Sequence, residues 1–414
     1  MTAPEPVGIE DVEAARARLA GVVRATPCVP SETLSAMTGS RVFLKLENLQ
    51  LTGSFKERGA ANLLLQLPDA ARRAGVIAAS AGNHGLGVAC HAARLAIAAT
   101  VVMPEWAPVA KVAQARRHGA QVVLAGESYD EAHARARELE RERGLVFVHP
   151  FDDPRVIAGQ GTIALEILEQ VPDLDAVLVP VGGGGLIGGL AVAVKARRPA
   201  TRVIGVQAAG LAAMRESLAA GQRVTVAPGL TIADGIAVRR VGQHTLELAR
   251  RHVDEIVTVD DEEIANAILI LLEVEKTVAE GAGAVPLAAL VNKRVALPGR
   301  TVVLVLSGGN IDVNLLSRII ERGLVKDGRV VRLAVLLRDR PGALARLSAA
   351  VAECRANVLH IRHDRVSPRT GLGESEVELT LETAGREQIE TIKRHLVAAG
   401  YGVREVERSG HDPG

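Results

Sequence analysis

The chain has 414 residues, of which 48% are hydrophobic and only 2% are aromatic, and its 49 lysines and arginines nearly balance its 48 acidic residues. The net charge of +1 removes the electrostatic basis for wrapping a nucleic acid, and so few aromatic residues make base-stacking platforms improbable. At about 150 residues per domain, the length predicts two or three domains, with a core built from Ala, Val, Leu and Ile.

The N-terminal segment and the cysteines favour a cytoplasmic protein. Residues 1–19 carry several acidic side chains and no apolar core segment, so we expect an amphipathic helix there rather than a secretory signal. Cys28, Cys90 and Cys354 are odd in number, far apart and without CxxC spacing. They therefore predict neither a disulfide framework nor a thiolate zinc site, and a reducing cytosol is the expected compartment.

Short apolar runs alternate with longer helical patterns over residues 1–326. We expect strands at residues 42–46, 76–80, 100–103, 121–124, 146–149, 176–181, 202–207, 255–259 and 301–306, and helices that include residues 109–118, 128–143 and 262–275. Because the strand runs are apolar throughout, they predict parallel strands that helices cover on both faces. The pattern is typical of a doubly wound α/β fold with open sheets.

The stretch from Ala176 to Val194 carries no charged side chain and is long enough to cross a bilayer. Pro180 and the glycines at 182–185 interrupt it, and both residue types strongly disfavour the centre of a helix. We therefore expect a buried strand, a glycine turn and a buried helix here, and no membrane association.

Near residue 327 the pattern changes to strand, helix, two strands, helix, strand. The strands are expected at residues 330–337, 357–363, 376–381 and 403–406, and the helices at residues 343–354 and 386–398. This βαββαβ order is a split βαβ unit of a size that folds alone. The sequence therefore predicts two domains, residues 1–326 and 327–414.

The segment 52–59 (TGSFKERG) places Lys56 at an expected helix start. The positive end of the helix dipole lowers the pKa of an amine there, and burial would lower it further. A neutral amine attacks aldehydes, which is the first step of Schiff-base chemistry. The alternative interpretation is a solvated lysine beside Glu57.

A second motif, residues 80–85 (SAGNHG), follows an expected strand and opens a helix. Its small residues allow backbone N–H groups to converge on an anion at the helix N-terminus. Asn83 adds an amide that can bond a phenolic or carbonyl oxygen. The alternative is a strand-to-helix turn in which Asn83 only caps the helix.

The four glycines at 182–185 form a third motif after an expected strand. Gly183, Gly185 and Gly188 satisfy the G-x-G-x-x-G pattern, so a dinucleotide site is one interpretation. That fingerprint expects an acidic residue about 20 positions further on, where this chain has Gln207. Four adjacent glycines favour a single phosphate surrounded by backbone N–H groups over a dinucleotide.

The fourth motif, residues 307–310 (SGGN), directly follows the expected strand 301–306. Ligands of open parallel sheets bind beyond the carboxyl ends of the strands, and all four motifs lie at such ends or in loops beside them. A Schiff-base lysine, an oxygen-binding asparagine, a phosphate cradle and a hydroxyl for a ring nitrogen together describe a pyridoxal 5'-phosphate site.

The combination of motifs resembles the threonine dehydratases (threonine ammonia-lyases) of the tryptophan synthase beta-like, pyridoxal phosphate-dependent family. The resemblance covers roughly residues 5–325 and rests on segments in the same order, residues 53–60, 80–85, 182–186, 231–235 and 307–310. It implies two doubly wound subdomains with the cofactor in the cleft between them, the smaller inserted at roughly residues 48–150. It also implies a homodimer or homotetramer.

The resemblance implies a role for each motif residue. Lys56 would be the Schiff-base lysine and the base that removes the α-proton, and Phe55 would pack on the cofactor ring. Asn83 would bond the ring oxygen, and Ser307 the pyridine nitrogen. The phosphate would be held by Gly182, Gly183, Gly184, Gly185 and Leu186. The substrate carboxylate would be surrounded by Ser80, Ala81, Gly82 and His84.

The implied reaction converts L-threonine into 2-oxobutanoate and ammonia by β-elimination, in amino-acid metabolism such as isoleucine biosynthesis, with L-serine as a second substrate. The alternatives are a dehydratase that prefers L-serine and a non-catalytic amino-acid-binding regulator. Ala81 stands where racemising relatives have a second serine, which argues against racemisation. Gln207 stands where some relatives have a metal-binding glutamate, so no metal is expected.

The C-terminal segment resembles an ACT domain, a βαββαβ module that senses amino acids. The resemblance rests on residues 339–344 (DRPGAL) at the first strand-to-helix turn and on Asn357 and Val358. It implies an allosteric site for isoleucine or valine formed by Asp339, Arg340, Pro341, Gly342, Ala343 and Leu344. The alternative is a merely structural or dimerising domain.

Overall fold

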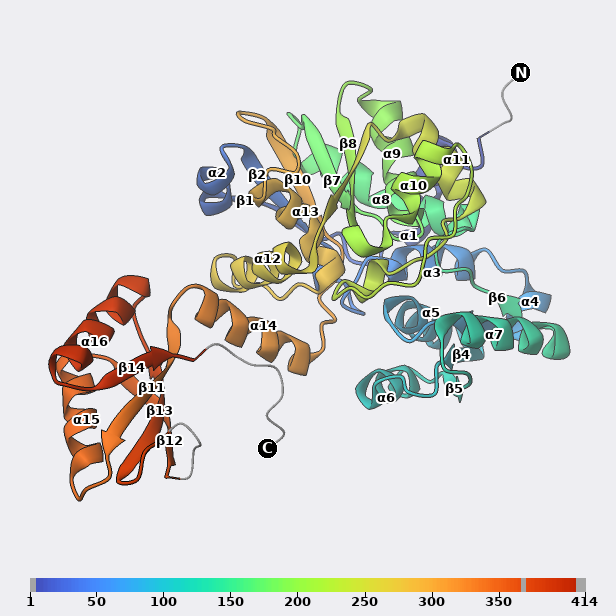
Figure 1. The fold of residues 1–414 in the computed structure, drawn as a ribbon. Coiled ribbons are helices and arrows are strands. Elements are labelled where there is room, and N and C mark those ends of the chain that lie inside the picture. Colours follow the sequence, from blue (N-terminus) through green and yellow to red (C-terminus); the bar gives the residue numbers. More distant parts are fainter. Residues whose placement is uncertain (1–4, 366–369, 407–414) are drawn as a thin grey trace. The chain divides into compact units, whose positions relative to one another are not determined.

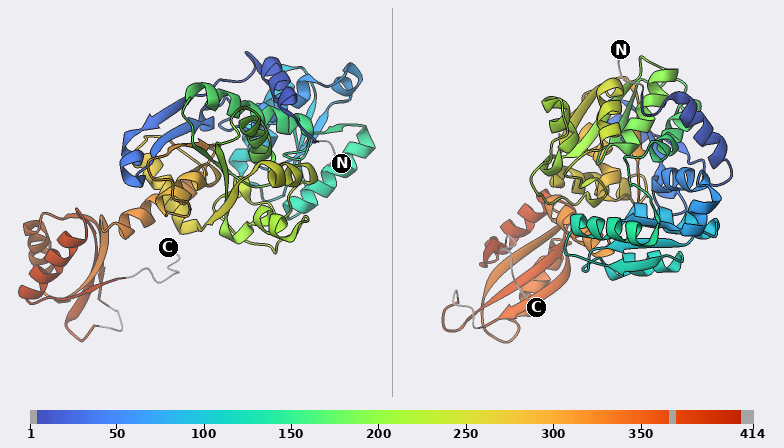
Figure 2. Two further views of the ribbon diagram at one scale, coloured as in Figure 1. Left: turned by 90° about the horizontal axis from the view of Figure 1, so that it is seen from above. Right: turned by 90° about the vertical axis from the view of Figure 1, so that its right-hand side faces the viewer.

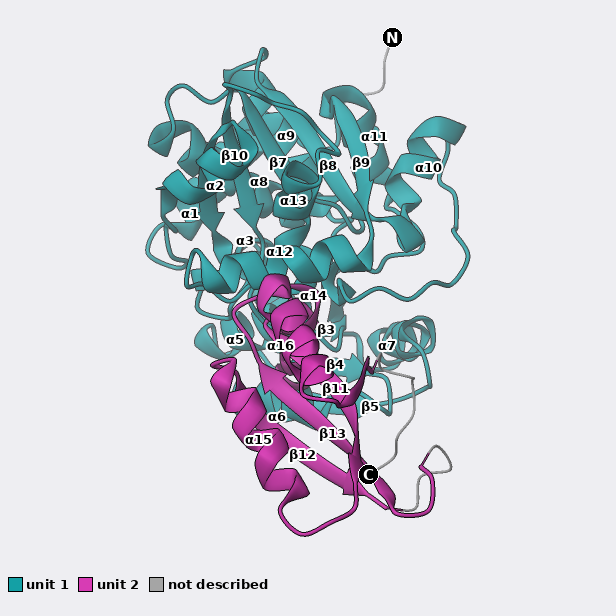
Figure 3. Cartoon of the chain, turned by 60° about the vertical axis from the view of Figure 1, so that its left-hand side comes forward, with its two compact units in different colours: residues 1–312 teal, residues 313–414 magenta. Residues whose placement is uncertain are grey.

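The computed structural model describes residues 5–365 and 370–406 (Figure 1). The chain divides into two compact units, residues 1–312 and 313–414, which Figure 3 colours separately. The sequence predicted this division after residue 326, but it lies before helix α14 (Val313–Lys326). The change of sequence pattern marks the end of α14, whereas packing groups this helix with strand β11 (Val330–Arg338) of the second unit.

A six-stranded sheet in the order β1-β2-β10-β7-β8-β9 forms the centre of the first unit. Its strands are β1 (Cys28–Ser31), β2 (Arg41–Leu46), β7 (Ala176–Pro180), β8 (Arg202–Ala208), β9 (Glu255–Val259) and β10 (Thr301–Leu306). All neighbours are parallel except β1, which runs antiparallel to β2 at the edge. We did not predict β1, because it is short and contains Pro30, a residue that sheets tolerate at their edges.

A second sheet in the same unit has the order β5-β4-β3-β6, with all neighbours parallel. It consists of β3 (Val76–Ala79), β4 (Ala99–Met103), β5 (Gln121–Leu124) and β6 (Val146–Phe147). These strands lie within the range 48–150 that we predicted for the smaller subdomain. In Figure 2 this sheet and its helices, drawn in cyan, form a layer of their own beside the larger sheet.

Helices cover both faces of the sheets. In the first unit they are α1 (Ile9–Leu19), α2 (Glu32–Thr38), α3 (Lys56–Leu65), α4 (Asp69–Ala74), α5 (Asn83–Arg94), α6 (Val109–Arg117), α7 (Tyr129–Arg143), α8 (Pro154–Gln170), α9 (Gly185–Arg197), α10 (Ala213–Ala220), α11 (Gln243–His252), α12 (Asp261–Glu273) and α13 (Gly281–Val291), with the 3-10 helices η1 (Glu47–Leu49), η2 (Ala209–Leu211) and η3 (Asp234–Ile236). Val76 and Ala78 of β3 pack with α3 and α5, whereas Ile77 and Ala79 pack with α7 on the opposite face. The predicted α/β arrangement is therefore confirmed.

The charge-free stretch 176–194 folds as predicted. β7 ends at Pro180, and α9 begins at Gly185 after the glycine turn. Among the described residues, no helix has the length and hydropathy that crossing a membrane requires. The expected N-terminal helix begins at Ile9, and residues 1–4 of that segment lie outside the described residues.

The second unit continues after α14 with the predicted βαββαβ order. Its elements are β11, α15 (Ala343–Glu353), β12 (Asn357–Asp364), β13 (Glu374–Glu382), α16 (Arg386–Ala398) and β14 (Gly402–Glu405). The sheet has the order β12-β13-β11-β14 and is antiparallel. Alternate residues of β11, such as Leu333 and Val335, form one core with Leu347 of α15 and Ile392 of α16, so both helices pack on the same face.

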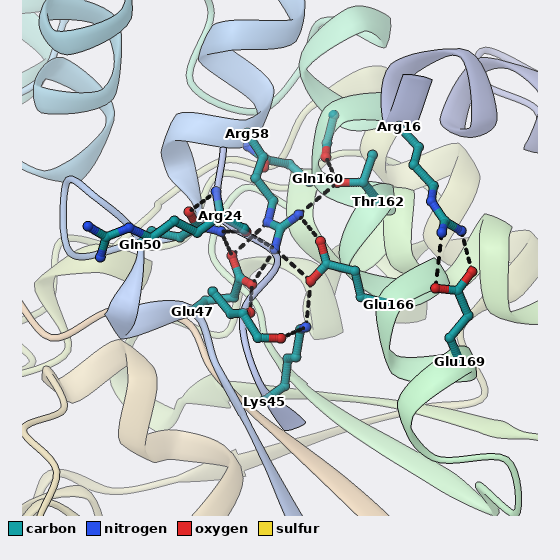
Figure 4. Close-up of polar contacts among 12 residues, drawn as sticks. Arg16, Arg24, Lys45, Glu47, Gln50, Arg58, Gln160, Thr162, Glu166 and Glu169 are labelled. Atoms are coloured by element: carbon teal, nitrogen blue, oxygen red, sulfur yellow. Dashed lines mark hydrogen bonds and ion pairs between the residues drawn. The ribbon is translucent and has the colours of Figure 1, made fainter. Parts of the chain in front are cut away.

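A buried network of charges joins α3 to the larger sheet (Figure 4). Arg58 of α3 donates through Nε to Glu47 Oε2 at 2.8 Å and through Nη1 to Glu166 Oε1 at 2.6 Å. Lys45, near the end of β2, donates through Nζ to Glu166 Oε2 and to the carbonyl oxygen of Thr26, both at 2.6 Å. Two cations thus face two carboxylates, and the side chains of Lys45, Glu47 and Arg58 are at most 1% exposed.

The network fixes the first turn of α3, which begins with Lys56. Burial raises the pKa of Glu47, but the Arg58 guanidinium, together with Lys45 and the Thr26 hydroxyl, outweighs burial and holds that pKa below its ordinary value. Glu166 lies on α8, which also passes directly against α3. At Gly159 of α8 a Cβ would lie 2.7 Å from the carbonyl oxygen of Arg58, so only glycine allows this approach.

We expect Glu47→Gln to lower the free energy of unfolding by about 3 kcal/mol near neutral pH, because Arg58 and Lys45 then face a single carboxylate in a buried site. The native pKa of Glu47 is depressed, so its contribution is present above the ordinary carboxyl pKa and is lost as the pH falls through the native pKa. The difference between the variant and the wild type should therefore shrink in acid.

Urea unfolding at several pH values measures both effects, and Glu138→Gln on the exposed face of α7 is the control. Equal stability of Glu47→Gln and the wild type near neutral pH would contradict a stabilising role for the network.

Candidate active site

Lys56 lies half-buried at the start of α3, with its amine close to the segment that follows β6. Its Nζ donates to the carbonyl oxygen of Pro150 at 3.0 Å and lies 5.2 Å from the centre of the Phe55 ring. Burial lowers the pKa of Lys56 to about 8, although the carboxylate of Glu280 opposes this shift. Part of the amine is therefore neutral near neutral pH and can act as the expected nucleophile.

The loop before Lys56 pairs with the loop after β10. The backbone N–H of Phe55 donates to Ser307 O at 3.0 Å, and Ser54 and Gly308 form an antiparallel bridge. Phe55 is half-buried and also packs against the core of the larger sheet. Because β2 and β10 are neighbours in that sheet, the structure brings Phe55, Lys56 and Ser307 together at the carboxyl ends of these strands.

Asn83 is the first residue of α5 and contacts the loop after β10 through Asn310. Its Oδ1 accepts from Asn310 Nδ2 at 2.7 Å, and its Nδ2 donates to Glu280 Oε1 and Oε2 at 2.8 and 3.0 Å. Asn310 Nδ2 also donates to Thr52 O at 2.8 Å. Gly82, not Asn83, is the N-cap residue of α5, so the alternative in which Asn83 only caps the helix is wrong.

The four residues expected around the substrate carboxylate lie at the N-terminus of α5. Ser80, Ala81 and Gly82 are half-buried, whereas His84 is buried. His84 Nε2 lies 2.8 Å from Val148 O, and because a carbonyl oxygen only accepts, Nε2 carries the hydrogen. Burial, with Lys56 adding to it, lowers the pKa of His84 to about 3. The ring is therefore neutral, and only the backbone N–H of His84 can donate to a carboxylate.

The glycines at 182–185 form the turn between β7 and the N-terminus of α9. A Cβ on Gly183 would lie 2.3 Å from Cγ of Phe151, so only glycine allows the Phe151 ring to lie there. Thr245 Oγ1 holds the turn by donating to Gly183 O at 2.6 Å. The side chain of Leu186 packs in the core, which leaves the backbone of the turn to face a ligand. Backbone N–H groups at a helix N-terminus bind phosphate.

Residues 148–152 link three of these motifs, and we did not predict them as part of the site. Val148 accepts from His84, Pro150 accepts from Lys56, and Phe151 packs over Gly183. The carboxylate of Asp152 accepts from the backbone N–H groups of the first turn of α11. No pattern of residue types distinguishes this segment from an ordinary strand exit, because its role depends on tertiary contacts.

Glu280 is a second site residue that we did not predict. It precedes α13 as the N-cap residue and is 4% exposed, and its backbone N–H donates to Gly308 O at 3.0 Å. Burial and the carboxylate of Asp234 raise the pKa of Glu280 to about 7, although the hydrogen bond from Asn83 opposes this shift. The signal that could have found it is a carboxylate directly before the small residues 281–284 at the start of a buried helix.

These residues fit pyridoxal 5'-phosphate. Lys56 offers an amine of lowered pKa to the aldehyde, and the turn at Gly183 offers bare backbone at a helix N-terminus to the phosphate. The amide of Asn83 and the loop of Ser307 lie beside Lys56, where they can face the ring oxygen and the ring nitrogen.

Gln207 does not supply the acidic side chain that a dinucleotide site would need to bind the ribose. It is buried at the end of β8, where its Nε2 donates to Val181 O at 3.3 Å and its Oε1 accepts from the backbone N–H of Arg215 at 2.9 Å. Both ends of the amide are therefore engaged by the backbone, and the side chain holds loops rather than a ribose. This geometry favours the single-phosphate interpretation of the glycine turn.

The predicted regulatory residues lie in the second unit, in the turn between β11 and α15. The backbone N–H of Asp339 donates to Gly373 O at 2.9 Å, and its carboxylate accepts from Arg365 Nε at 3.0 Å. Gly342, with φ of +80°, is the N-cap residue of α15. Asp339, Arg340, Pro341 and Gly342 form the turn, and Ala343 and Leu344 are the first residues of α15.

Known proteins resemble this chain over most of its length. Residues 19–308 match the model of a family described as "Pyridoxal-phosphate dependent enzyme". The chain is 50% identical over 400 residues to an L-threonine ammonia-lyase of Thermotoga maritima, which covers 97% of this chain and 100% of that protein. Similar solved structures include a threonine deaminase from tomato, Solanum lycopersicum, with a TM-score of 0.73 and 38% identity over 77% of this chain and 90% of that one. Maize serine racemase has a TM-score of 0.73 and 34% identity over 78% of this chain and 99% of that one.

We expect Gly183→Ala to weaken the binding of pyridoxal 5'-phosphate to the apo-protein about tenfold or more, because the added methyl group overlaps the Phe151 ring and displaces the turn. Fluorescence titration of the apo-protein with the cofactor measures the dissociation constant. Gly188→Ala in α9, the helix that follows the turn, is the control, since its Cβ would lie 3.3 Å from Cδ1 of the flexible Leu248 side chain. Equal affinity of Gly183→Ala and the wild type would argue against the phosphate cradle.

Proposed function

This chain belongs to the pyridoxal-phosphate-dependent enzyme family, and we propose that it is a threonine ammonia-lyase, which converts L-threonine into 2-oxobutanoate and ammonia. The observation that carries the proposal is the half-buried Lys56 amine of lowered pKa, held at Pro150 beside the asparagine and serine loops. The identity of 50% over nearly the whole chain to a relative named L-threonine ammonia-lyase supports the choice of substrate.

Pyridoxal 5'-phosphate, when bound, supplies an aldehyde for the substrate amino group and withdraws electrons from the carbon that loses its proton. Lys56 would hold the aldehyde of the cofactor, and its Nζ would accept the α-proton of the substrate. A pKa of about 8 suits both the attack on the aldehyde and the acceptance of the proton, because the amine is partly neutral near neutral pH and still basic enough to take the proton. Pro150 O orients the amine through one hydrogen bond.

Ser307 favours elimination over transamination in this proposal. A hydroxyl group facing the pyridine nitrogen does not keep that nitrogen protonated, as a carboxylate would, so electrons are withdrawn less strongly from the substrate. Rapid loss of the β-hydroxyl group is then favoured over slower transformations. We assign the ring oxygen to Asn83, the ring face to Phe55, and the phosphate to the backbone of residues 182–186.

The N-terminus of α5 is the site we propose for the substrate carboxylate. Ser80, Ala81 and Gly82 are half-buried there, and the backbone N–H groups of this first turn attract an anion. His84 takes part through its backbone, because its neutral ring already donates to Val148 O. This arrangement anchors the amino acid by its carboxylate and directs its α-carbon toward Lys56.

L-Serine is the second substrate that we propose. The two substrates differ by one methyl group, which a pocket discriminates by only about 1–3 kcal/mol, so an enzyme for one is expected to act on the other. Racemisation is not proposed, although serine racemases share the fold. A racemase needs a proton-carrying group on the opposite face of the substrate, and Ala81 has no such group. The intact set of Lys56, Asn83 and Ser307 also weighs against a non-catalytic regulator.

We further propose that residues 327–414 form an ACT-like regulatory domain that binds isoleucine or valine at the turn 339–344. Its βαββαβ order and its antiparallel sheet with both helices on one face support this assignment. The proposal includes a homodimer or homotetramer and a role in amino-acid metabolism. The free thiols of Cys28, Cys90 and Cys354 support the cytoplasm as the compartment.

Lys56→Ala is expected to lose the visible absorbance of the covalently bound cofactor and to form 2-oxobutanoate from L-threonine about 10²–10⁴ times more slowly, because no amine remains to hold the aldehyde or take the α-proton. Absorption spectra and a keto-acid assay of the purified protein measure these effects. Lys195→Ala, which removes the lysine that pairs with Asp254, is the control and should keep the absorbance. Persistence of the absorbance in Lys56→Ala would contradict the proposed function.

Asp339→Ala is expected to reduce the response to isoleucine or valine at least about fivefold, while activity without effector stays within about twofold of the wild type. The substitution removes the ion pair with Arg365 that braces the proposed effector turn. The measurement is 2-oxobutanoate formation at increasing effector concentration, with Glu387→Gln on α16 as the control. An unchanged response in Asp339→Ala would argue against an effector site at this turn.

A further inference from the structure

The amide of Asn83 is held from both ends. Asn310 donates to its Oδ1 at 2.7 Å, and the carboxylate of Glu280 accepts from its Nδ2 at 2.8 and 3.0 Å. A donor at one end and a carboxylate at the other allow only this orientation. If the amide were reversed, its N–H groups would face those of Asn310 and its oxygen would face Glu280.

The orientation of the Asn83 amide depends on a backbone carbonyl group, which acts through Asn310. Asn310 Nδ2 also donates to Thr52 O at 2.8 Å, and because a carbonyl oxygen only accepts, it fixes the orientation of the Asn310 amide. At the other end, Glu280 is anchored by its backbone N–H, which donates to Gly308 O at 3.0 Å. The series Thr52, Asn310, Asn83 and Glu280 is thus fixed at both ends by the loops that carry Lys56 and Ser307.

One hydrogen of the Asn83 amide remains after these contacts. Nδ2 carries two hydrogens, and both of its contacts are to the one carboxylate of Glu280, which uses a single hydrogen in a bifurcated bond. We infer that Glu280 is a positioning residue, which takes one amide hydrogen of Asn83 so that the other is directed to the ring oxygen of pyridoxal 5'-phosphate. The inference rests on the cofactor contact proposed for Asn83 and deepens it.

Glu280 also brings a titratable charge to this contact. Three charged groups act on it from other elements, Asp234 from η3, Lys111 from α6 and Lys56 from α3, and Lys111 pairs with Asp234 at 2.9 Å. Burial and Asp234 raise the pKa of Glu280 to about 7, and both lysines oppose the shift. Above that pH the carboxylate is a strong acceptor for Asn83, whereas below it the carboxylic acid is a weaker one. Ionisation of Glu280 should therefore change the hydrogen bond that Asn83 donates to the ring oxygen.

Two substitutions at position 280 separate the hydrogen bond from the charge. Glu280→Gln keeps an oxygen that can accept from Asn83 but cannot ionise, whereas Glu280→Ala removes the acceptor. We expect the apo-protein to bind pyridoxal 5'-phosphate about tenfold more weakly in Glu280→Ala and within about threefold of the wild type in Glu280→Gln.

The visible absorbance of the loaded enzyme without substrate should change through about pH 7 in the wild type and stay constant over that range in Glu280→Gln. Glu138→Gln, on the exposed face of α7, is the control for both measurements.

Wild-type affinity in Glu280→Ala would overturn the inference, and so would an unchanged pH transition in Glu280→Gln. Circular dichroism establishes that each variant is folded, and if Glu280→Ala does not fold, the pH transition of the isosteric Glu280→Gln decides. Asn83→Ala separates this failure from a failure of the proposed site. If Asn83→Ala weakens cofactor binding while both Glu280 variants behave as the wild type, only the role of Glu280 is wrong. If Asn83→Ala binds as the wild type does, the ring-oxygen contact is wrong and the inference with it.

Discussion

A network of four charges, formed by Arg58 with Lys45, Glu47 and Glu166, fixes the position of the helix from which the site is built. Lys45 lies near the end of β2, Glu47 begins η1 directly after it, Glu166 lies on α8, and Arg58 lies two residues after Lys56 (Figure 4). Removing one of these charges leaves another uncompensated in a buried environment, so a displacement of α3 is opposed by several kcal/mol. The amine of Lys56 is therefore presented at a fixed position beside the carboxyl ends of β2 and β10.

Around this fixed helix, backbone contacts complete the site. The loops of Phe55 and Ser307 pair as short extended segments, and residues 148–152 connect Lys56 and His84 with the glycine turn. Glycine serves two purposes here. Gly183 lies in the turn expected to bind the phosphate, whereas Gly159 allows α8 to pass against the backbone of α3.

The strands and the four site motifs could be predicted because each is a contiguous pattern in the sequence. The site residues that are brought in by tertiary contacts could not. The strand at 301–306 has the predicted bounds, because a continuous β-branched and aliphatic run that is buried on both faces resembles few other structures. The four motifs were recognisable because each is a contiguous segment at a strand end. Pro150 and Phe151 carry no local signal, since their roles come from partners that are distant in sequence. Glu280 stands before a recognisable run of small residues, but its partner Asn83 lies 197 positions away and could not be read from that run.

The central claim is that Lys56 is the lysine that holds pyridoxal 5'-phosphate, and the most direct measurement identifies that lysine chemically. Borohydride reduction of the loaded enzyme makes the link permanent, and peptide mass spectrometry locates the modified side chain. The account predicts a pyridoxyl group on Lys56 and an unmodified Lys45, because Lys45 is fully buried in its ion pair with Glu166. A pyridoxyl group on another lysine, with Lys56 unmodified, would contradict the account.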